Sequence, residues 1–489
     1  MEKPFKELNT LNDSNPNKKK AKLITDTGLD FRDRVSHYDN KGKRVWVYPK
    51  KPAGKYHRWR VIVAVILLAI MFGLPFIKIN NNPFVLLDVL QRKFIIFGAV
   101  FWPQDFHILA LSFLALVIFV VLFTTIYGRI WCGWACPQTI FMEMVFRKIE
   151  YWIEGDYHQQ KELNNSPMNG NKFIKKFAKH SIFLFISFLI SNLVLSYIIG
   201  VDNVLLMMTD GPLAHIGVFV AVVGNTGVFY FVYSWFREQA CVYVCPYGRL
   251  QSVLIDKNTL VVAYDYKRGE PREKFKKNQE QNAGDCVDCA ACVKVCPTGI
   301  DIRNGTQLEC VNCTACMDAC DEVMLKVNRP TGLIRYASIT NIEEGTKYTF
   351  GARTTLYTIA LVILLGVISY LMTTRSQVEA NILKAKGSTF QYTENNHIAN
   401  IYTVTCINKS FDPINLEFKL IDLKGKITVI GNKKLELSPN GILDATIMIE
   451  LNRSDITGTR NEIHIGLYSN NKLIQNISTG FTGPAPGMQ

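Results

Sequence analysis

Five stretches of this 489-residue chain carry no charged side chain and are long enough to cross a lipid bilayer. They are residues 61–77, 108–126, 181–201, 216–236 and 354–374. A spanning helix needs about 20 apolar residues, with a lower limit of about 17. Buried core helices are the alternative interpretation, but five such stretches are not expected in one soluble protein. The sequence therefore predicts a membrane protein with a bundle of five transmembrane helices.

Lysine and arginine are distributed unevenly among the segments that connect these stretches. Residues 1–60 and 127–180 are rich in both, whereas the loop 202–215 contains neither. Because cytoplasmic loops carry the excess of Lys and Arg, we expect the N-terminus, 127–180 and 237–353 inside the cell and everything from 375 onward outside. This topology explains the net charge of +14, so nucleic acid is not expected as a partner.

Two cysteine quartets with the same spacing lie between the fourth and fifth stretches. They read "CVDCAACVKVCP" (Cys286, Cys289, Cys292, Cys296) and "CVNCTACMDACD" (Cys310, Cys313, Cys316, Cys320). In two-cluster ferredoxins, three cysteines of one motif and the last of the other hold each cluster. We therefore predict one [4Fe–4S] cluster on Cys286, Cys289, Cys292 and Cys320, and a second on Cys310, Cys313, Cys316 and Cys296. Zinc is the alternative, but its sites rarely use two such quartets in tandem, and cytosolic thiols rarely form disulfides.

Two further cysteine pairs follow the second and fourth stretches. "IWCGWACPQ" holds Cys132 and Cys136, and "ACVYVCPYG" holds Cys241 and Cys245. A proline follows each pair and suits the first position of a helix, so Cys136 and Cys245 are expected at helix N-termini, where positive partial charge favours thiolate. One isolated pair would be interpreted as packing. Two pairs at equivalent positions of a repeat, each made of two spans and a thiol pair, favour functional thiols.

The tail from about residue 390 changes to short alternating segments, such as "NIYTVTCIN", "DATIMIEL" and "NEIHIGLYS". Turn sequences such as "DLKGK" and "SPNG" separate them. This pattern predicts an antiparallel, immunoglobulin-like sandwich. Cys406 has no partner in the tail, so no disulfide is expected there. We interpret the tail as an interaction domain, with a stabilising cap as the alternative.

In combination, the ferredoxin insert, the two Cys-x-x-x-Cys-Pro pairs, the run "RPTGLIRY" and the β-rich tail resemble the cytochrome c oxidase accessory family of CcoG/FixG/RdxA-like membrane ferredoxins. Membrane ferredoxins of the NapH type share a similar plan but are not expected to carry the long tail. The resemblance implies a bacterial inner-membrane protein with a cytoplasmic ferredoxin domain and a periplasmic C-terminal domain. It also implies reduction of Cu(II) to Cu(I) for assembly of a cbb-type oxidase, with copper transporters or chaperones and oxidase subunits as partners.

Copper chemistry would fall to the two thiol pairs, because soft thiolates select Cu(I). The predicted site of copper binding and reduction is formed by Cys132, Cys136, Cys241 and Cys245. Met142 and Met144 are further candidate ligands, although packing is the more ordinary role of methionine. Two other functions stay open: a quinol-linked electron-transfer subunit and a non-enzymatic copper-binding chaperone. No Gly-rich nucleotide fingerprint accompanies the quartets, so NADH or flavin is not expected to bind directly, and the electron donor is unknown. A homodimer is compatible with these features.

These observations divide the chain into five parts. They are a basic cytoplasmic arm (1–57), a four-helix transmembrane region with both thiol pairs (58–255), a cytoplasmic ferredoxin-like domain with two clusters (256–345), a fifth transmembrane helix (346–376) and an exported immunoglobulin-like domain (377–489). The expected fold class is therefore a multidomain membrane protein that combines an α-helical bundle, an inserted bacterial-type ferredoxin and an all-β sandwich.

Overall fold

The computed structural model describes residues 44–79, 82–89, 92–211, 213–274, 283–345, 351–385, 387, 389–393, 397–410, 412–431, 435–469 and 471–484. The chain forms two compact units. Unit 1 consists of Met1–Pro75 and Phe113–Leu364, and unit 2 consists of Phe76–Ser112 and Leu365–Gln489. Most of the basic arm predicted for 1–57 lies outside the described residues.

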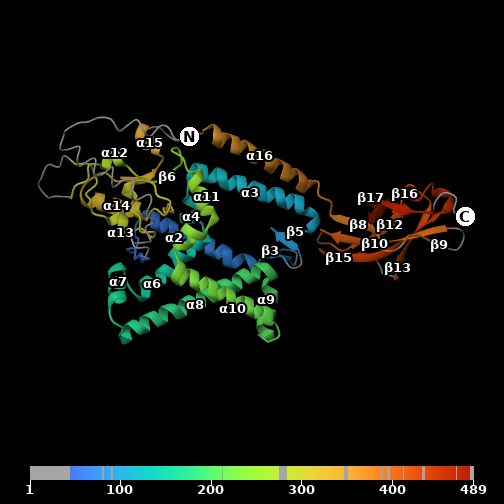
Figure 1. The fold of residues 1–489 in the computed structure, drawn as a ribbon, viewed down its shortest axis with the longest axis horizontal. Helices are drawn as coiled ribbons and strands as arrows, with labels where there is room; N and C mark the ends of the chain where they lie inside the picture. Colours follow the sequence, from blue (N-terminus) through green and yellow to red (C-terminus); the bar gives the residue numbers. More distant parts are fainter. Residues whose placement is uncertain are drawn as a thin grey trace. The chain divides into compact units, whose positions relative to one another are not determined.

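Each of the five predicted spans is an apolar helix, and the chain is a multi-pass membrane protein (Figure 1). The helices are α2 (Lys55–Gly73), α3 (Phe106–Tyr127), α8 (Gly170–Ile199), α10 (Ile216–Phe231), which the π-helical turn η4 (Val232–Phe236) continues, and α16 (Ala352–Thr373). Many of their large apolar side chains are exposed, as expected of surfaces that face lipid. Helices α8 and α10 lie side by side, and the Ser191 hydroxyl donates to the Val222 carbonyl between them at 3.1 Å.

Helix α8 begins well before the predicted third span. Its first turns carry Lys176 and Lys179, and both ammonium groups lie 2.9 Å from the buried carboxylate of Glu154. Because these charges are paired, the helix continues beyond its apolar part. It ends where Gly200 takes a φ of 88°, and a further helix, α9 (Val201–Asp210), occupies most of the segment that the sequence suggested was a loop.

The segment between α3 and α8 is a series of short helices. They are α4 (Ile130–Trp134), α5 (Pro137–Ile140), the π-helical η3 (Phe141–Phe146), α6 (Arg147–Ile153) and α7 (Tyr157–Asn165). The fully buried Phe146 stacks on Tyr233 of η4, with ring centroids 4.4 Å apart. Aromatic stacking of this kind fixes the first thiol loop against the end of the fourth span.

The predicted ferredoxin-like region folds around a two-stranded antiparallel sheet of β6 (Val261–Tyr264) and β7 (Ile334–Ala337). Four helices accompany this sheet: α12 (Tyr266–Gly269), α13 (Ala291–Lys294), α14 (Ala315–Lys326) and α15 (Ile339–Glu344). The buried side chains of Met324, Leu333 and Ile334 pack in one cluster with several of the quartet cysteines. The apolar core of this region therefore surrounds the residues predicted to bind iron.

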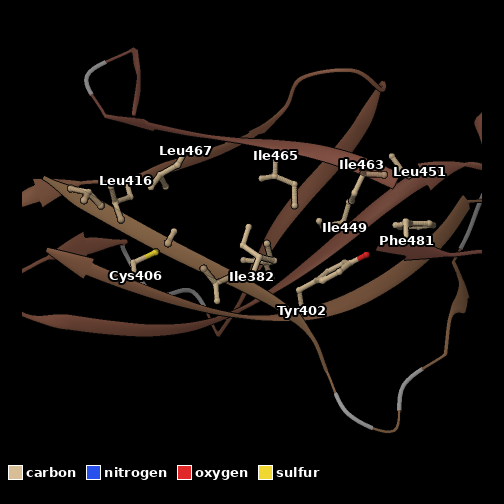
Figure 2. Packing of buried hydrophobic residues seen from close by; sticks show 14 of the residues in the cluster. Ile382, Tyr402, Cys406, Leu416, Ile449, Leu451, Ile463, Ile465, Leu467 and Phe481 are labelled. Carbon is tan, nitrogen blue, oxygen red and sulfur yellow. The ribbon is translucent and has the colours of Figure 1, made fainter. Parts of the chain in front are cut away.

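The tail folds as a two-sheet β-sandwich, as predicted. One sheet has the strand order β13–β15–β10–β8 with β9 beside β10, the other has β12–β16–β17, and β11 pairs with β14. The strands are β8 (Val378–Lys384), β9 (Gln391–Thr393), β10 (His397–Asn408), β11 (Ile414–Asn415), β12 (Glu417–Leu420), β13 (Gly425–Ile430), β14 (Glu436–Leu437), β15 (Ile442–Asn452), β16 (Arg460–Ser469) and β17 (Lys472–Thr482). Buried residues such as Ile382, Tyr402 and Ile465 fill the core between the sheets, and Cys406 lies there as a free thiol (Figure 2).

A small sheet between the first two spans was not expected from the sequence. Strands β3 (Val85–Asp88), β4 (Lys93–Ile96) and β5 (Ala99–Phe101) form an antiparallel meander, after a short β1–β2 pair (Lys78–Ile79 and Asn82–Pro83). Its buried side chains Ile95, Val100 and Trp102 pack with Ile407 of β10. The segment after the first span and the tail after the fifth span therefore share one core within unit 2.

A buried ion network joins the same two segments. The carboxylate of Asp105, which is only 2% exposed, lies 2.6 Å from the guanidinium of Arg375 and 2.7 Å from the ammonium of Lys409. Lys409 also pairs with Glu379 of β8 at 2.7 Å. Breaking a buried pair of this kind costs several kcal/mol, roughly 3–5, because it leaves an uncompensated charge. The network therefore connects the sandwich with Asp105, just before α3, and with Arg375, just after α16.

Candidate functional site

The two predicted sets of cluster ligands surround two separate cavities in the ferredoxin-like region. Cys286, Cys289, Cys292 and Cys320 line one cavity, together with Arg303 and Met324. Cys296, Cys310, Cys313 and Cys316 line the other, together with Thr298 and Thr314, and Cys292 reaches its edge. Each group combines three cysteines of one motif with the last cysteine of the other. This donor set fits the exchange of ligands that two-cluster ferredoxins use.

The backbone repeats an uncommon conformation at equivalent places in the two motifs. Asp288 and Ala290 have positive φ angles of 49° and 54°, and Asn312 and Thr314 have 53° and 64°. In both motifs these are the residues just before and just after the second cysteine. Left-handed residues turn successive N–H groups toward one concave side, which suits an anionic group. Such strain in non-glycine residues points to a functional constraint.

The two ligand groups differ in their exposure. Cys289 of the first group is exposed, whereas Cys296, Cys310, Cys313 and Cys316 of the second are all at least partly covered. Burial raises the pKa of Cys310 to about 12 and that of Cys313 to about 11. Because metal-bound cysteine is thiolate, cluster binding must remove these protons.

Each membrane-side thiol pair ends at the start of a helix, as the sequence predicted. Cys136 is the N-cap of α5 and Cys245 is the N-cap of α11 (Pro246–Leu254), with proline at the first helical position of each. Each pair also lies near a π-helical turn, which the sequence did not reveal: η3 follows α5, and η5 (Ala240–Val244) contains Cys241. Turns of this type occur frequently at functional sites.

The two halves of the repeat meet at these pairs. The thiol of Cys132 lies 3.3 Å from the Oε1 of Gln251, a fully buried residue of α11. The hydroxyl groups of Thr124 and Tyr247 lie 3.3 Å apart. The Arg129 guanidinium donates to the carbonyl of Gly248. These contacts join the end of the second span to the helix that follows the second thiol pair.

All four thiols are close enough to influence one another. Burial raises the pKa of Cys132 to about 12, and the charges of Cys136 and Cys245 add to the rise. Burial likewise raises the pKa of Cys241 to about 12, with further contributions from Cys136, Cys132 and Cys245. Across the described ranges, however, no three Cys, His, Asp or Glu side chains are grouped tightly enough to hold a single ion together. The four thiols are therefore near one another, but their side chains would have to move closer together to bind one metal ion.

Three buried carboxamides near the thiols have amide nitrogens with no hydrogen-bond partner among the described residues. They belong to Gln138, Gln251 and Asn312. Buried donors normally have acceptors. Unused N–H donors beside a group of thiols suit a ligand set that carries negative charge, as thiolates do when they bind metal.

The first thiol loop contacts the second group of cluster ligands directly. A Cβ placed on Gly133 would lie 2.5 Å from the carbonyl oxygen of Val311 and 2.8 Å from that of Asn312, so only glycine allows this approach. Val311 and Asn312 stand between Cys310 and Cys313. The indole of Trp134 also donates to the Tyr336 hydroxyl at 3.1 Å. The backbone between Cys132 and Cys136 therefore touches the backbone between two predicted cluster ligands.

Residues at the start of the first span, α2, form hydrogen bonds to both the thiol loop and the ferredoxin-like region. Arg60 donates from Nε to the Gly133 carbonyl at 2.6 Å. One turn earlier, the amides of Tyr56 and His57 donate to the carboxylate of Asp318, at 3.1 and 2.8 Å. Asp318 lies on α14 between Cys316 and Cys320, so a ferredoxin side chain caps the N-terminus of a membrane helix.

The remaining candidate residues lie in different surroundings. Met142 lines a cavity with Cys241, whereas Met144 packs between Ala64 and Ile140. Sequence reasoning missed Arg60, Arg129, Gln251 and Asp318. Of these four residues, only Arg60 could have been suspected from the sequence, because it lies at the edge of the first apolar stretch.

Two four-cysteine ligand groups, the second of them in contact with a thiol loop, in a chain with five apolar helices, define a membrane-bound iron–sulfur electron-transfer protein. Family models agree with this class. Residues 236–339 match a 4Fe-4S dicluster domain, 109–155 match a 4Fe-4S binding domain, and 368–484 match an IG-like fold at the C-terminus of FixG.

Known proteins identify the family. The chain is 34% identical to protein RdxB of Cereibacter sphaeroides over 390 residues, which cover 75% of this chain and 80% of RdxB. It is 34% identical to the nitrogen fixation protein FixG of Rhizobium meliloti, covering 66% of this chain and 62% of FixG, and 35% identical to protein RdxA of C. sphaeroides, covering 61% and 64%. The chain therefore belongs to the FixG/RdxA/RdxB family of membrane ferredoxins.

Proposed function

We propose that this protein is a membrane-bound cupric reductase that supplies Cu(I) for assembly of a cbb-type oxidase. The observation that carries the proposal is the contact of Gly133 with Val311 and Asn312, which brings the thiol loop against the second ligand group. A thiol site that touches a one-electron carrier is suited to a metal that changes its charge by one. Thiolate ligands favour Cu(I) over harder ions, so they also favour the reduced product.

The ligand sets follow the two cavities. We assign Cys286, Cys289, Cys292 and Cys320 to the first cluster and Cys296, Cys310, Cys313 and Cys316 to the second. When bound, such clusters supply single electrons at low potential. One Cu(II) takes one electron and becomes Cu(I), and a low-potential one-electron carrier replaces that electron. The chain's own residues gather the thiols, exclude water by burial and hold the thiol loop through Arg60.

A double replacement of Cys132 and Cys136 by serine tests the copper site. We expect both iron–sulfur spectra to persist, copper binding to weaken and anaerobic reduction of Cu(II) to fall by about two orders of magnitude, because the soft ligands are lost. The measurements are copper stoichiometry and Cu(I) formation after reduction with dithionite. Cys406→Ala is the matched control, because Cys406 lies in the core of the sandwich, and it should reduce copper normally.

Other outcomes would favour other functions. Normal copper binding and reduction in the double variant would remove these thiols from the mechanism. Unchanged copper affinity with loss of quinone-linked cluster reduction would favour a quinol-linked subunit. Copper binding without turnover would favour a non-enzymatic chaperone.

A third iron–sulfur site is a second candidate role for the same thiols. The family model for a 4Fe-4S binding domain covers 109–155, which includes Cys132 and Cys136. Four thiols are the ligand number that such a cluster requires. Iron analysis separates the two roles: about eight irons per chain fit the copper proposal, whereas about twelve would fit a third cluster.

We also propose that the ferredoxin-like region is cytoplasmic and the tail periplasmic. The Lys/Arg distribution supports this orientation. The shared core of β3–β5 and the tail gives further support, since segments after the first and fifth spans must lie on the same side of the membrane. In this arrangement the clusters face cytoplasmic reductants, and the sandwich is available to oxidase subunits or copper transporters. A homodimer would be compatible with the sandwich acting either as an interaction domain or as a stabilising cap.

Reporter fusions test this orientation. A fusion at about residue 330 should be active only with a cytoplasmic reporter, and a fusion at the C-terminus only with a periplasmic one, because five spans separate the N-terminus from the tail. A fusion in the β3–β4 turn should behave like the C-terminal one. Finding residue 330 and the C-terminus on the same side would disprove the arrangement.

A further inference from the structure

Two arginines are buried between the second ligand group and the thiols. Arg60 is 4% exposed and Arg129 is 8% exposed. Their guanidinium groups donate to backbone carbonyls, that of Arg60 to Gly133 and that of Arg129 to Leu308 and Gly248. Within the part of the chain that the structure describes, neither forms an ion pair with a carboxylate. A buried charge without a counter-charge is costly, so these positions call for an anionic neighbour.

The neighbours of these arginines are cysteines. Arg129 donates to the carbonyl of Leu308, two residues before Cys310. Arg60 donates to the carbonyl of Gly133, whose backbone packs against Val311 and Asn312, the two residues between Cys310 and Cys313. Cys310 and Cys313 belong to the second ligand group. A cluster held by four thiolates is anionic, and it gains a further negative charge on reduction. Positive charge nearby therefore stabilises the reduced form.

The first ligand group has the opposite surroundings. Arg303 lines its cavity, but Asp301 and Asp288 neutralise that arginine at 2.7 and 2.6 Å. Asp321 adds a negative charge next to Cys320. Three carboxylates therefore accompany the single arginine at the first cavity. Arg129 lines a cavity with Glu143, Glu238 and Glu309, but Glu143 and Glu238 are paired with Arg147 at 3.1 and 3.7 Å, so Arg60 and Arg129 keep the positive charge beside the second ligand group. The Cys296 sulfur of the second group also lies 3.4 Å from the Thr298 hydroxyl, within hydrogen-bonding distance for sulfur.

We propose that Arg60 and Arg129 hold the second cluster at a higher midpoint potential than the first, and so set the direction of electron flow. Net charge and hydrogen bonds to sulfur are established determinants of cluster potential. With both clusters bound, a low-potential one-electron carrier would reduce the first cluster from the exposed Cys289 side and would itself be oxidised. The second cluster would then reoxidise the first, with no proton transferred. This inference rests on the proposed function only in naming the thiols as the electron's destination.

Redox titration of the full-length protein, followed by electron paramagnetic resonance without copper, tests the inference. In Arg60→Gln and in Arg129→Gln we expect the higher of the two midpoints to fall and the lower to stay unchanged. The expected shift is at least a tenfold change in the ratio of reduced to oxidised cluster at fixed potential, equivalent to about 59 mV for one electron. Arg60→Lys keeps the charge and should keep the midpoint. Arg58→Gln removes an exposed charge two residues away on α2 and is the matched control.

Asp321→Asn provides a second, independent test. It removes a charge beside the first group while leaving an oxygen to accept from the Gly332 amide, so the lower midpoint should rise and the higher should not move. Unchanged midpoints in both glutamine variants would overturn the inference. So would an equal shift of both clusters, or a fall in Arg60→Lys as large as in Arg60→Gln. If one glutamine variant lost iron, the midpoint of the other glutamine variant would decide. Because copper is absent, the result does not depend on whether the thiols reduce copper.

Discussion

Replacing Cys313 by serine is expected to remove about half of the bound iron and to abolish electron flow to the thiols. Cys313 is one of four cysteines around the second cavity and lies beside the thiol loop. A [4Fe–4S] cluster needs all four ligands, and the two motifs exchange ligands, so the first cluster should also be weakened. Iron analysis and Cu(II) reduction by the dithionite-reduced protein are the measurements.

Cys289→Ser offers the contrast on the first ligand group. It should also lose about four of eight irons, because each four-iron cluster depends on its own ligand set. With the first cluster gone, reduction by a protein-sized carrier should fail, whereas a small reductant that reaches the second cluster should still support some turnover. A Cys313→Ser protein that kept its full iron content and full reductase activity would exclude the ligand assignment.

Gly133→Ala is expected to slow Cu(II) reduction by about two orders of magnitude while both clusters stay bound. The new methyl group would overlap the carbonyl oxygens of Val311 and Asn312, so the thiol loop must move away from the second ligand group. A displacement of about 1 Å at a reacting centre can cost about 10²-fold in rate. Single-turnover kinetics after reduction by dithionite would measure the step directly.

Gly217→Ala is the matched control for this substitution. Gly217 lies in α10, and a Cβ there would meet nothing within 4 Å. The change should leave the rate unaffected and slightly favour the helix, by about 1 kcal/mol at most. Normal single-turnover kinetics in Gly133→Ala would show that this contact has no part in electron transfer.

Much of the fold could be predicted because its signals are local. Uninterrupted apolar sequence is sufficient to identify a spanning helix, whatever its neighbours are, and α2, α3, α8, α10 and α16 all form where such sequence occurs. Alternation with turn residues identified the strands of the sandwich for the same reason. The small sheet β3–β5 was not predicted from the sequence, because its strands are only three or four residues long. They gain their stability from packing with Ile407, far away in the sequence.

The cysteine spacing was sufficient to predict the two groups of candidate cluster ligands, since a cubane cluster imposes a fixed spacing on three of its four ligands, and each predicted group lines its own cavity. The repeated Cys-Pro pairs also determined that Cys136 and Cys245 begin helices. Only the tertiary structure decided how these parts meet. Asp318 caps a helix whose amides lie more than 260 positions earlier, and Arg60 holds a carbonyl 73 residues away. Local sequence does not predict such pairs. The hydrogen bonds stabilise the fold only once folding has brought distant charges and backbone groups together in a buried place.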